Sequence, residues 1–197
     1  APGERGEVAE GRVGDEEHVA AVAAVAAVGA ALRHVFLATE GEPAVAAIYD
    51  PSRRELFTAE RGQGAWLNGA PLKVSGARTL IDSLLCTGFP YSVQRDAESL
   101  VGLFGEFLKV SRAVRRLGSA AIDLAYVAAG RLDGFWEQSL HPWDVAAGAL
   151  IIQEAGGIVT DLAGGPYSSR TGNLVATNGH IHAAMVEIIQ GFLKGSG

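Results

Sequence analysis

RRLGSAAIDLAYVAAGRLDGFWEQSLHPWDVAAGALIIQEAGGIVTDLAGG, residues 115–165, is the stretch that decides the fold of this chain. A helix is predicted to begin at Gly118-Ser119, where the serine hydroxyl can cap free N–H groups, and to end at Gly130. The short aromatic segment after it, DGFWE, predicts a strand that ends in a carboxylate. A second helix opens at the Trp-Asp pair and ends at Gly156-Gly157. The stretch therefore predicts a helix, a strand and a helix in close succession.

Asp144 lies at the start of the second helix, whose apolar residues Val145, Ala149 and Ile152 share one face. Two interpretations of Asp144 stay open. As an N-cap, its carboxylate would accept backbone N–H groups and match the positive end of the helix dipole. As a ligand, it would hold a hard cation, because Mg²⁺ takes carboxylate oxygens and usually shares itself with a substrate phosphate. Spacing alone favours the N-cap without excluding the ligand.

Two segments of this stretch, GSAAIDLAYVAAGRLDGFWE and HPWDVAAGALIIQEAGGIVTDLAGGP, resemble the carboxy-terminal signature of the inositol monophosphatase family. These are Mg²⁺-dependent, lithium-sensitive phosphomonoesterases. The match is long, in order and ungapped, so it is more specific than a short motif. It extends backwards through IYDPSRRELFTAERGQGAWLNGAPLKVS and forwards through GNLVATNGHIHAAMVEII, and covers the chain from about Glu40 onward.

The resemblance implies an α/β fold, the layered α-β-α-β-α sandwich of the sugar phosphatases. It also implies hydrolysis of inositol monophosphate, or a related polyol or sugar phosphate, by Mg²⁺-activated water, in a homodimeric protein. By position, Asp144 matches a metal ligand, and Glu137 matches a glutamate that binds substrate hydroxyls. Gly118, Ser119 and Ala120 match the segment that contacts the sugar or inositol ring. No catalytic residue is assigned.

The family's other metal ligands have no counterpart in this sequence. The resemblance would place them in a Gly-Glu-Glu segment and an Asp-Pro-x-Asp-Gly-Thr motif, and neither occurs here. Asp50-Pro51 resembles a later turn of the family, and Asp15-Glu16-Glu17 is interpreted as a charged helix start. The block that carries both motifs would lie near Val35, and it is either lost from the protein or omitted from the sequence. Omission is favoured, because a shortened sheet would expose unpaired backbone groups. The alternative function is a catalytically inactive or truncated family member that binds a ligand or a protein partner.

Composition and charge narrow the class of protein. The chain has 197 residues, 48% of them hydrophobic, which suits one globular domain or two small ones that share a core. A net charge of −6 without a basic run argues against a nucleic-acid partner. There is no secretory pattern and no apolar run long enough to span a bilayer, so a cytoplasmic protein without a membrane partner is expected. The single cysteine, Cys86, lies in the apolar segment SLLCTGF and predicts a buried structural thiol.

The predicted domain organisation begins with a lead-in. Residues 1–14 lack apolar periodicity and are predicted to be disordered or extended. Residues 15–197 are predicted to form one phosphatase-like domain. Within it, residues 15–110 are the remnant of the amino-terminal half, opening with an Ala/Val-rich helix that reaches about Leu32, and residues 111–197 are the carboxy-terminal half. Because of the missing block, the amino-terminal part of the sandwich is expected to be incomplete.

Periodicity and turn residues predict the remaining elements. The Asn68-Gly69 pair predicts a hairpin, and residues 96–110 predict an amphipathic helix. Arg112, Arg115 and Arg116 are interpreted as a solvated helix end or edge strand, with a phosphate contact as the alternative. The five histidines share no metal spacing, so zinc is not expected. Strands are predicted at 44–48, 55–59, 65–68, 71–74, 83–88, 158–162 and 174–177, and a terminal helix at 180–193.

Overall fold

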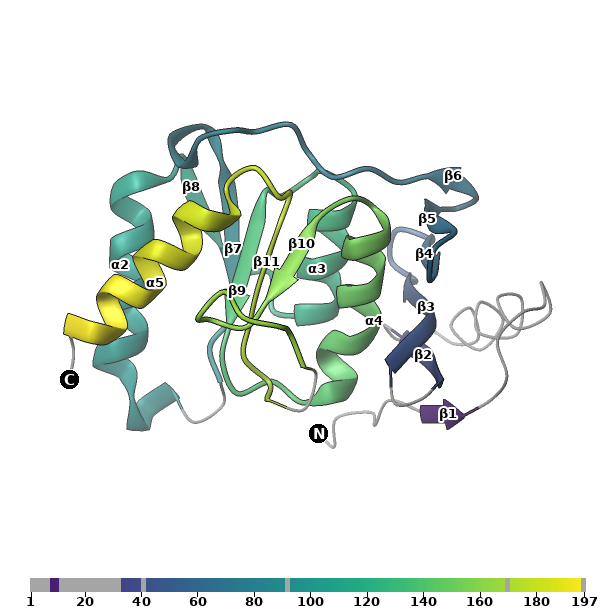
Figure 1. Cartoon of the computed structure of the whole chain (residues 1–197), viewed down its shortest axis with the longest axis horizontal. Coiled ribbons are helices and arrows are strands. Elements are labelled where there is room, and N and C mark those ends of the chain that lie inside the picture. The colour runs from purple at the N-terminus through teal and green to yellow at the C-terminus, as the bar shows by residue number, and fades with distance from the viewer. Residues whose placement is uncertain (1–7, 11–32, 40–41, 91–92, 169–170, 196–197) are drawn as a thin grey trace.

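Two β-sheets frame the molecule, which a computed structural model describes over residues 8–10, 33–39, 42–90, 93–168 and 171–195 (Figure 1). The first sheet has the strand order β1-β2-β3-β4-β5-β6. Neighbours from β2 to β6 pair antiparallel, and β1 pairs with β2 in parallel. The outer edge of β2 is therefore covered by a further strand. The six strands are β1 (Val8–Glu10), β2 (Arg33–Thr39), β3 (Glu42–Asp50), β4 (Glu55–Glu60), β5 (Gly64–Leu67) and β6 (Ala70–Pro71).

The second sheet has the order β10-β11-β9-β7-β8, with β8 as an edge strand. Its strand β7 pairs in parallel with both β8 and β9, whereas β11 pairs antiparallel with β9 and β10. Because β7 and β9 run in the same direction, their carboxyl ends meet at one edge of the sheet. The five strands are β7 (Leu84–Thr87), β8 (Ala113–Arg115), β9 (Gly134–Glu137), β10 (Ile158–Thr160) and β11 (Leu174–Thr177).

Among the described residues, four α-helices complete the layers: α2 (Ala97–Val110), α3 (Ala120–Ala128), α4 (Pro142–Glu154) and α5 (His182–Gly195), with short 3-10 turns η1 (Leu80–Asp82) and η2 (Val93–Arg95). Figure 1 shows α3 and α4 between the two sheets, and α2 and α5 on the far side of the second sheet. The described residues thus form four alternating layers, β-α-β-α, which confirms the predicted fold class. The helix predicted from Asp15 to about Leu32 lies outside the described residues.

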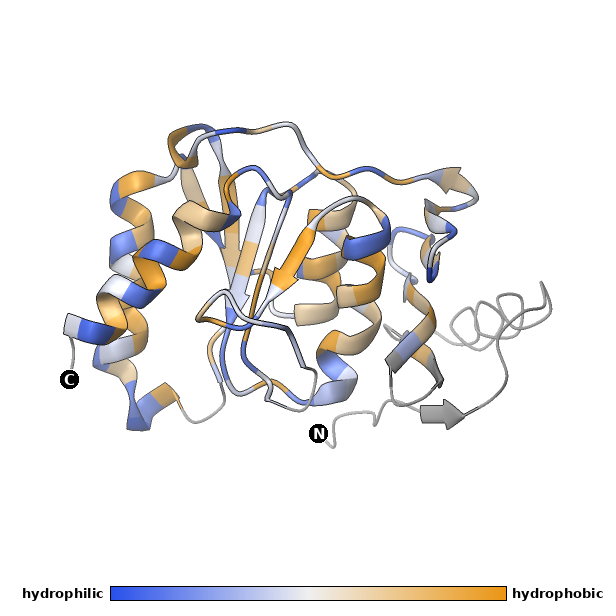
Figure 2. Cartoon of the chain, viewed as in Figure 1, coloured by the Kyte–Doolittle hydropathy of each residue, from blue (hydrophilic) through white to orange (hydrophobic). Residues whose placement is uncertain are grey.

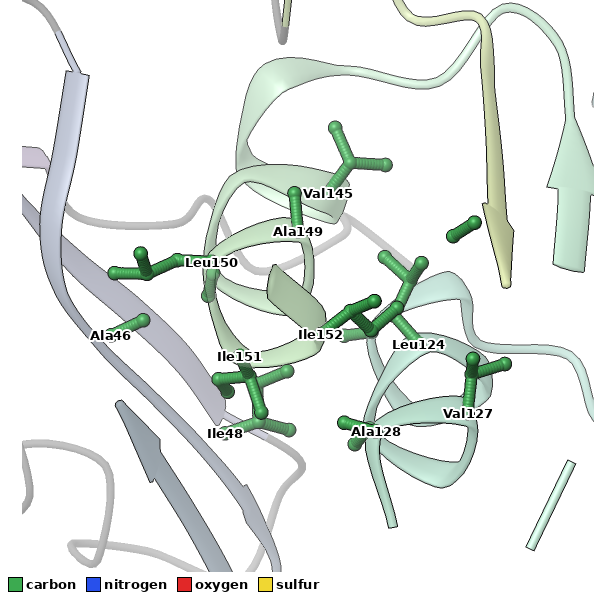
Figure 3. Close-up of a cluster of buried hydrophobic side chains, with 14 of the residues drawn as sticks. Ala46, Ile48, Leu124, Val127, Ala128, Val145, Ala149, Leu150, Ile151 and Ile152 are labelled. Atoms are coloured by element: carbon green, nitrogen blue, oxygen red, sulfur yellow. The ribbon is translucent and has the colours of Figure 1, made fainter. Parts of the chain in front are cut away.

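Helix α4 is buried on all sides, whereas the sequence pattern placed its apolar residues on one face. Residues 145–152 are all buried, because the helix packs against β3 on one side and α3 on the other (Figure 3). Gly148 allows this close approach, since a Cβ there would lie 2.6 Å from the Leu124 Cβ. Burial of the Leu150, Ile151 and Ile152 side chains of α4 contributes roughly 5–9 kcal/mol to stability. That is comparable to the whole net stability of a typical domain.

Helices α2 and α5 each turn one apolar side to the second sheet. Hydrophobic and hydrophilic bands alternate along both helices in Figure 2. Leu103 and Phe107 of α2 lie in one buried cluster with Trp136 of β9 and Met185 of α5. The Phe107 and Trp136 ring centroids are 4.1 Å apart. None of the helices in the described part of the chain is long and apolar enough to cross a membrane.

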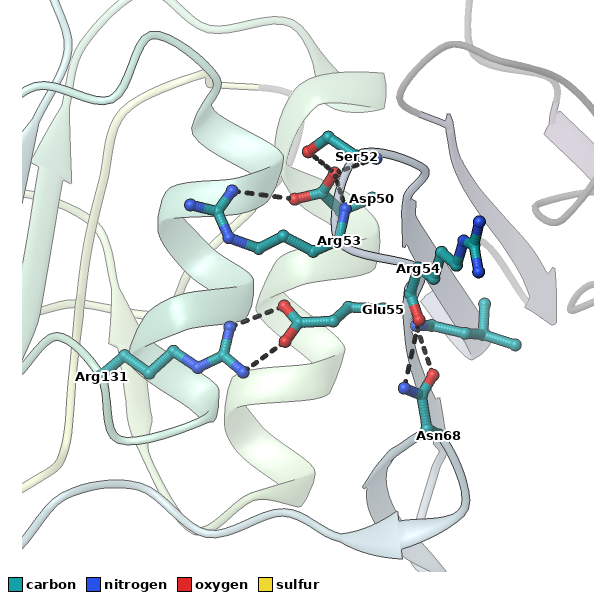
Figure 4. A network of polar contacts seen from close by, with 8 residues as sticks. Asp50, Ser52, Arg53, Arg54, Glu55, Asn68 and Arg131 are labelled. Carbon is teal, nitrogen blue, oxygen red and sulfur yellow. Dashed lines mark hydrogen bonds and ion pairs between the residues drawn. The ribbon is translucent and has the colours of Figure 1, made fainter.

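A polar network ties the first sheet to the helix layer (Figure 4). Glu55 of β4 accepts two hydrogen bonds of 2.7 Å from the guanidinium of Arg131, which follows α3. At the end of β5, Asn68 and Gly69 have φ angles of +49° and +81°, so the predicted Asn-Gly turn is confirmed. The Asn68 side chain also bonds the backbone at the start of β4. The turn thus holds β5 to β4, and the ion pair holds β4 to the segment that follows α3.

One predicted segment is extended as expected, and another is shorter than predicted. Within the lead-in predicted as disordered or extended, residues 8–10 form strand β1, which satisfies backbone groups at the edge of β2. The other residues of the lead-in lie outside the described part. The strand predicted at 71–74 stops at Pro71, which has no N–H group to donate to a ladder. The chain then leaves the first sheet and crosses to the second.

Candidate functional site

A cavity of about 590 Å³ opens where β7 and β9 end. All five residues that the sequence analysis singled out, Gly118, Ser119, Ala120, Glu137 and Asp144, line this cavity. They come from the start of α3, the end of β9 and the first turn of α4. The structure therefore brings the predicted residues together, and their individual roles stay predictions. The other lining residues are His34, Gly88, Phe89, Pro90, Val93, Arg116, Ala121, Asp123 and Leu140.

Glu137 is the last residue of β9 and is 7% exposed. Its carboxyl group lies against the Cα of Gly88, where any side chain would overlap with it. Burial raises the pKa of Glu137 to about 7, and the negative charges of Asp123 and Asp144 raise it further, while Arg116 acts in the opposite direction. Near neutral pH the group is shared between its protonated and ionised forms. It can therefore donate a hydrogen bond to a ligand hydroxyl or accept one from it.

The N-terminus of α3 borders the same cavity. Gly118 has a φ of +97°, which favours glycine, and turns the chain into the helix. Ser119 is the N-cap residue, but its side chain makes no capping hydrogen bond, so the predicted capping role of its hydroxyl is wrong. The first N–H groups of the helix lack an intrahelical partner and carry the positive end of its dipole. They can therefore bind the oxygen of a hydroxyl or phosphate group.

Asp144 lies in the first turn of α4, three residues after the N-cap, which is His141. Its Oδ2 accepts a hydrogen bond of 3.0 Å from the His141 backbone N–H. The carboxylate therefore stabilises the helix start, as the first interpretation held, but from the N3 position. It also lines the cavity, as the second interpretation requires. Both roles are compatible, because the carboxylate has a second oxygen.

Asp123 is a cavity residue that the sequence analysis missed. It lies one turn into α3, where its N–H bonds the Ser119 carbonyl at 2.9 Å, and it is 1% exposed. Burial raises its pKa to about 6, although a hydrogen bond with Cys86 opposes the rise. Cys86 is fully buried, as predicted, and burial also raises its pKa. The sequence did hold a signal for Asp123. It lies four residues after Ser119, and residues four apart lie on the same face of a helix, so Asp123 could be expected near the same site.

His34 and Arg116 bring a neutral base and a cation to the cavity. Neither ring nitrogen of His34 has a hydrogen-bond partner in the described part of the chain. Burial lowers the pKa of His34, although the charge of Asp144 opposes this. The Arg116 guanidinium lies 5.2 Å from the Phe89 ring centroid and is exposed. Arg115, by contrast, belongs to edge strand β8, as the solvated interpretation predicted.

The carboxyl groups of the cavity do not by themselves fit a Mg²⁺ site. No group of three or more His, Cys, Asp or Glu side chains in the described residues could hold a metal ion. Asp144 matches a metal ligand of the family by position, and it brings to the cavity the carboxylate oxygens that Mg²⁺ prefers. The described residues therefore offer one candidate ligand and no complete set.

Comparison with known proteins gives a family match. The model described as the Inositol monophosphatase family matches residues 19–192. The "Nus factor SuhB" of Escherichia coli (strain K12) is 52% identical over 147 residues, which cover 75% of this chain and 55% of the relative. The "Inositol-1-monophosphatase" of Rhizobium meliloti (strain 1021) is 44% identical over 156 residues, which cover 79% of this chain and 59% of the relative.

Solved structures agree with this match. The inositol monophosphatase from Anabaena (Nostoc) sp. PCC 7120 superposes with a TM-score of 0.74 at 44% sequence identity, over 77% of this chain and 60% of that one. The Thermotoga maritima IMPase TM1415 superposes with a TM-score of 0.75 at 28% identity, over 100% of this chain and 78% of that one. The chain spans less than two thirds of the length of the two curated relatives.

Proposed function

Because the chain belongs to the inositol monophosphatase family, we propose that it acts in the Mg²⁺-dependent hydrolysis of a phosphomonoester, with inositol monophosphate or a related polyol or sugar phosphate as substrate. The observation that carries this proposal is the cavity at the ends of β7 and β9. A helix N-terminus, the Arg116 cation and the Glu137 carboxyl group all line it. Its volume of about 590 Å³ lies in the range of small-molecule sites.

The chain's own residues would bind and orient the alcohol that the reaction releases. In phosphomonoester hydrolysis, water oxygen bonds to phosphorus, the P–O ester bond breaks, and the alcohol oxygen gains a proton. We assign the hydroxyl groups of the substrate to Glu137 and to the backbone of Gly118, Ser119 and Ala120. Arg116 would offset the negative charge of the ester from the cavity rim. These contacts hold the leaving group in one orientation, which lowers the entropic cost of reaction.

Asp144 is the described residue that we propose as a magnesium ligand. The rest of the coordination would come from groups outside the described residues, so no residue is assigned to activate the attacking water. The test is phosphate release from inositol 1-phosphate with and without Mg²⁺, for the wild-type protein and Asp144→Asn. We expect Mg²⁺-dependent release that falls more than about 100-fold in the variant, since even outer-shell partners of metal ligands change activity 10- to 100-fold.

The matched control for this test is Asp82→Asn, which removes an exposed carboxylate on η1. This variant should release phosphate at the wild-type rate. An Asp144→Asn protein with full activity would remove Asp144 from the site.

The second candidate function is a non-catalytic family member that binds a phosphorylated ligand or a protein partner. The incomplete metal-ligand set of the described residues favours it. Saturable binding of inositol 1-phosphate without phosphate release in Mg²⁺ would support this function over catalysis. We also propose, from the family resemblance alone, that the protein is a cytoplasmic homodimer, which light scattering and cell fractionation test.

A further inference from the structure

A short loop, residues 138–141, connects Glu137 at the end of β9 to helix α4, which carries Asp144. Both acids line the cavity, and so does Leu140 within the loop. Because the loop is short, its backbone conformation decides how far apart the two carboxyl groups lie and how they are directed. The groups that hold this loop therefore also set the geometry of the cavity wall.

The segment just before β11 holds two consecutive N–H groups of this loop. The Ser139 N–H donates to Oδ1 of Asn173 at 2.9 Å. The Leu140 N–H donates to the carbonyl of Gly172 at 2.9 Å. Glycine is needed at 172, since a Cβ there would overlap with the Leu140 carbonyl oxygen. The Leu140 side chain packs against the buried core, so the loop is held by its backbone on one side and by apolar contacts on the other.

The pairing of β9 and β11 brings Asn173 to the loop. Leu174 of β11 pairs with Glu137, the last residue of β9. Asn173 lies one residue before Leu174, and its side chain continues the contact between the two strands past their last pair. It does so at the point where the chain leaves Glu137 for α4.

Ser139 needs such a contact because of its backbone conformation. Its φ angle is +61°, in the left-handed region. For a residue with a Cβ this conformation costs free energy, and it persists where the surroundings hold it. Water could replace the energy of this exposed hydrogen bond, but it would leave the direction of the Ser139 N–H free. The oxygen of Asn173 fixes that direction.

We infer that Asn173 is a positioning residue of the cavity: its side-chain oxygen holds the loop after Glu137 in the conformation that places Asp144 for the hydrolysis of a phosphate ester. This inference rests on the proposed function, because it concerns the same cavity. Asn173 is not among the residues that line the cavity, so it is assigned no contact with the substrate. Its loss should act on Asp144 through the backbone of the loop.

The first test is amide exchange with water, measured by NMR in the wild-type protein, Asn173→Ala and Asn173→Asp. Loss of the acceptor speeds exchange at Ser139 whatever else it does. If Asn173 holds the whole loop, the Leu140 and His141 amides, whose own acceptors remain, should also exchange at least about tenfold faster in Asn173→Ala. Asn173→Asp keeps an oxygen in the same place, so exchange should return to within about twofold of the wild-type rates.

The second test is phosphate release from inositol 1-phosphate in Mg²⁺. We expect kcat/KM to fall at least about tenfold in Asn173→Ala, since a misplacement of about 1 Å in a site can cost about 100-fold. Asn173→Asp should recover most of this loss. If the wild-type protein binds inositol 1-phosphate without turnover, its affinity in calorimetry takes the place of kcat/KM.

The matched control is Asn68→Ala. The Asn68 Oδ1 also accepts an exposed backbone N–H, from Leu56 at 2.9 Å, but it lies in the first sheet and does not line the cavity (Figure 4). Its loss should speed exchange at Leu56 and leave Leu140 and phosphate release unchanged. Cooperative melting of each variant shows that it is folded. Asn173→Ser, whose oxygen lies one bond closer to the backbone, replaces Asn173→Ala if that variant does not fold.

The outcomes separate this inference from the proposed function. Faster exchange confined to Ser139 would overturn the inference, because Asn173 would then hold one N–H group and not the loop. Opening of the loop with unchanged phosphate release, or unchanged affinity, would overturn it as well. A wild-type protein that binds inositol 1-phosphate without releasing phosphate contradicts the proposed function alone, and one that does neither contradicts both.

Discussion

Glu137→Gln should stabilise the protein in a way that depends on pH. The folded-state pKa of about 7 lies above the ordinary value of 4.5, so the folded state favours the protonated form. Ionisation therefore costs stability: the penalty is nearly absent below the unfolded pKa and grows as pH rises until it is complete above the folded pKa. At 1.36 kcal/mol per pKa unit, the penalty is about 3 kcal/mol at pH 8 and about 1 kcal/mol at pH 5. Glutamine carries no charge at either pH.

The assay is urea unfolding of the wild-type protein and Glu137→Gln at pH 5 and pH 8. The difference in unfolding free energy between the two proteins should shift by about 2 kcal/mol in favour of the variant as pH rises. Asp123 is present in both proteins, but its charge interacts with Glu137, so the shift measured in this comparison includes that interaction. Glu106→Gln is the control, because Glu106 is exposed on α2 and should give the same difference at both pH values. A constant difference for Glu137→Gln would refute the argument that burial sets its pKa.

Two further substitutions test residues that hold the cavity and its neighbouring strand in place. Gly88→Ala should weaken the binding of inositol 1-phosphate, measured by calorimetry, with little loss of stability. The new Cβ would overlap with the flexible end of Glu137 and displace its carboxyl group. Unchanged affinity would contradict this. Asp133→Asn should lower the urea-unfolding free energy by about 1–3 kcal/mol. One Asp133 oxygen accepts a hydrogen bond of 2.5 Å from the Ser75 hydroxyl, and the other accepts one of 2.6 Å from the Leu84 N–H. The amide of asparagine replaces one of these acceptors with a donor. Asp82→Asn, on the exposed surface, should change it by less than about 0.5 kcal/mol, and an equal effect of both variants would argue against the network.

Turn residues and periodicity predicted most of the described elements, because they act locally. The Asn68-Gly69 hairpin, the strand before Glu137 and the helix over 97–110 all follow from residues within one or two turns of chain. Burial of α4 on all sides could not be predicted in this way. Its second apolar face is matched by β3, which lies about a hundred residues earlier in the sequence, and only the tertiary fold brings them together. Local patterns therefore predicted the elements, while the layer between the two sheets needed the structure.

Some residues of the candidate site were predicted from the sequence and others were missed, for a similar reason. Glu137 and Asp144 were found by resemblance, since each belongs to a recognisable motif. Asp123 and Gly88 were missed because their importance depends on neighbours from other elements. Gly88 matters because β7 and β9 are parallel neighbours, which puts its Cα against Glu137. In the sequence, Asp123 looks like an ordinary acid on a short helix. Only the structure shows that it is buried beside a cavity.

The distribution of cavity residues along the chain explains how a recognition surface can persist without a full metal set. Apart from His34 of β2, every lining residue comes from residues 88–144, and these elements are held by the second sheet and the buried helix pair α3 and α4. The resemblance would place the other metal motifs of the family near Val35, before this range. Asp144, the proposed magnesium ligand, lies within that range, so hydroxyl recognition and metal binding would share one cavity. The residues proposed to bind hydroxyl groups come from α3 and β9, so binding of inositol 1-phosphate without phosphate release would be a physically consistent result.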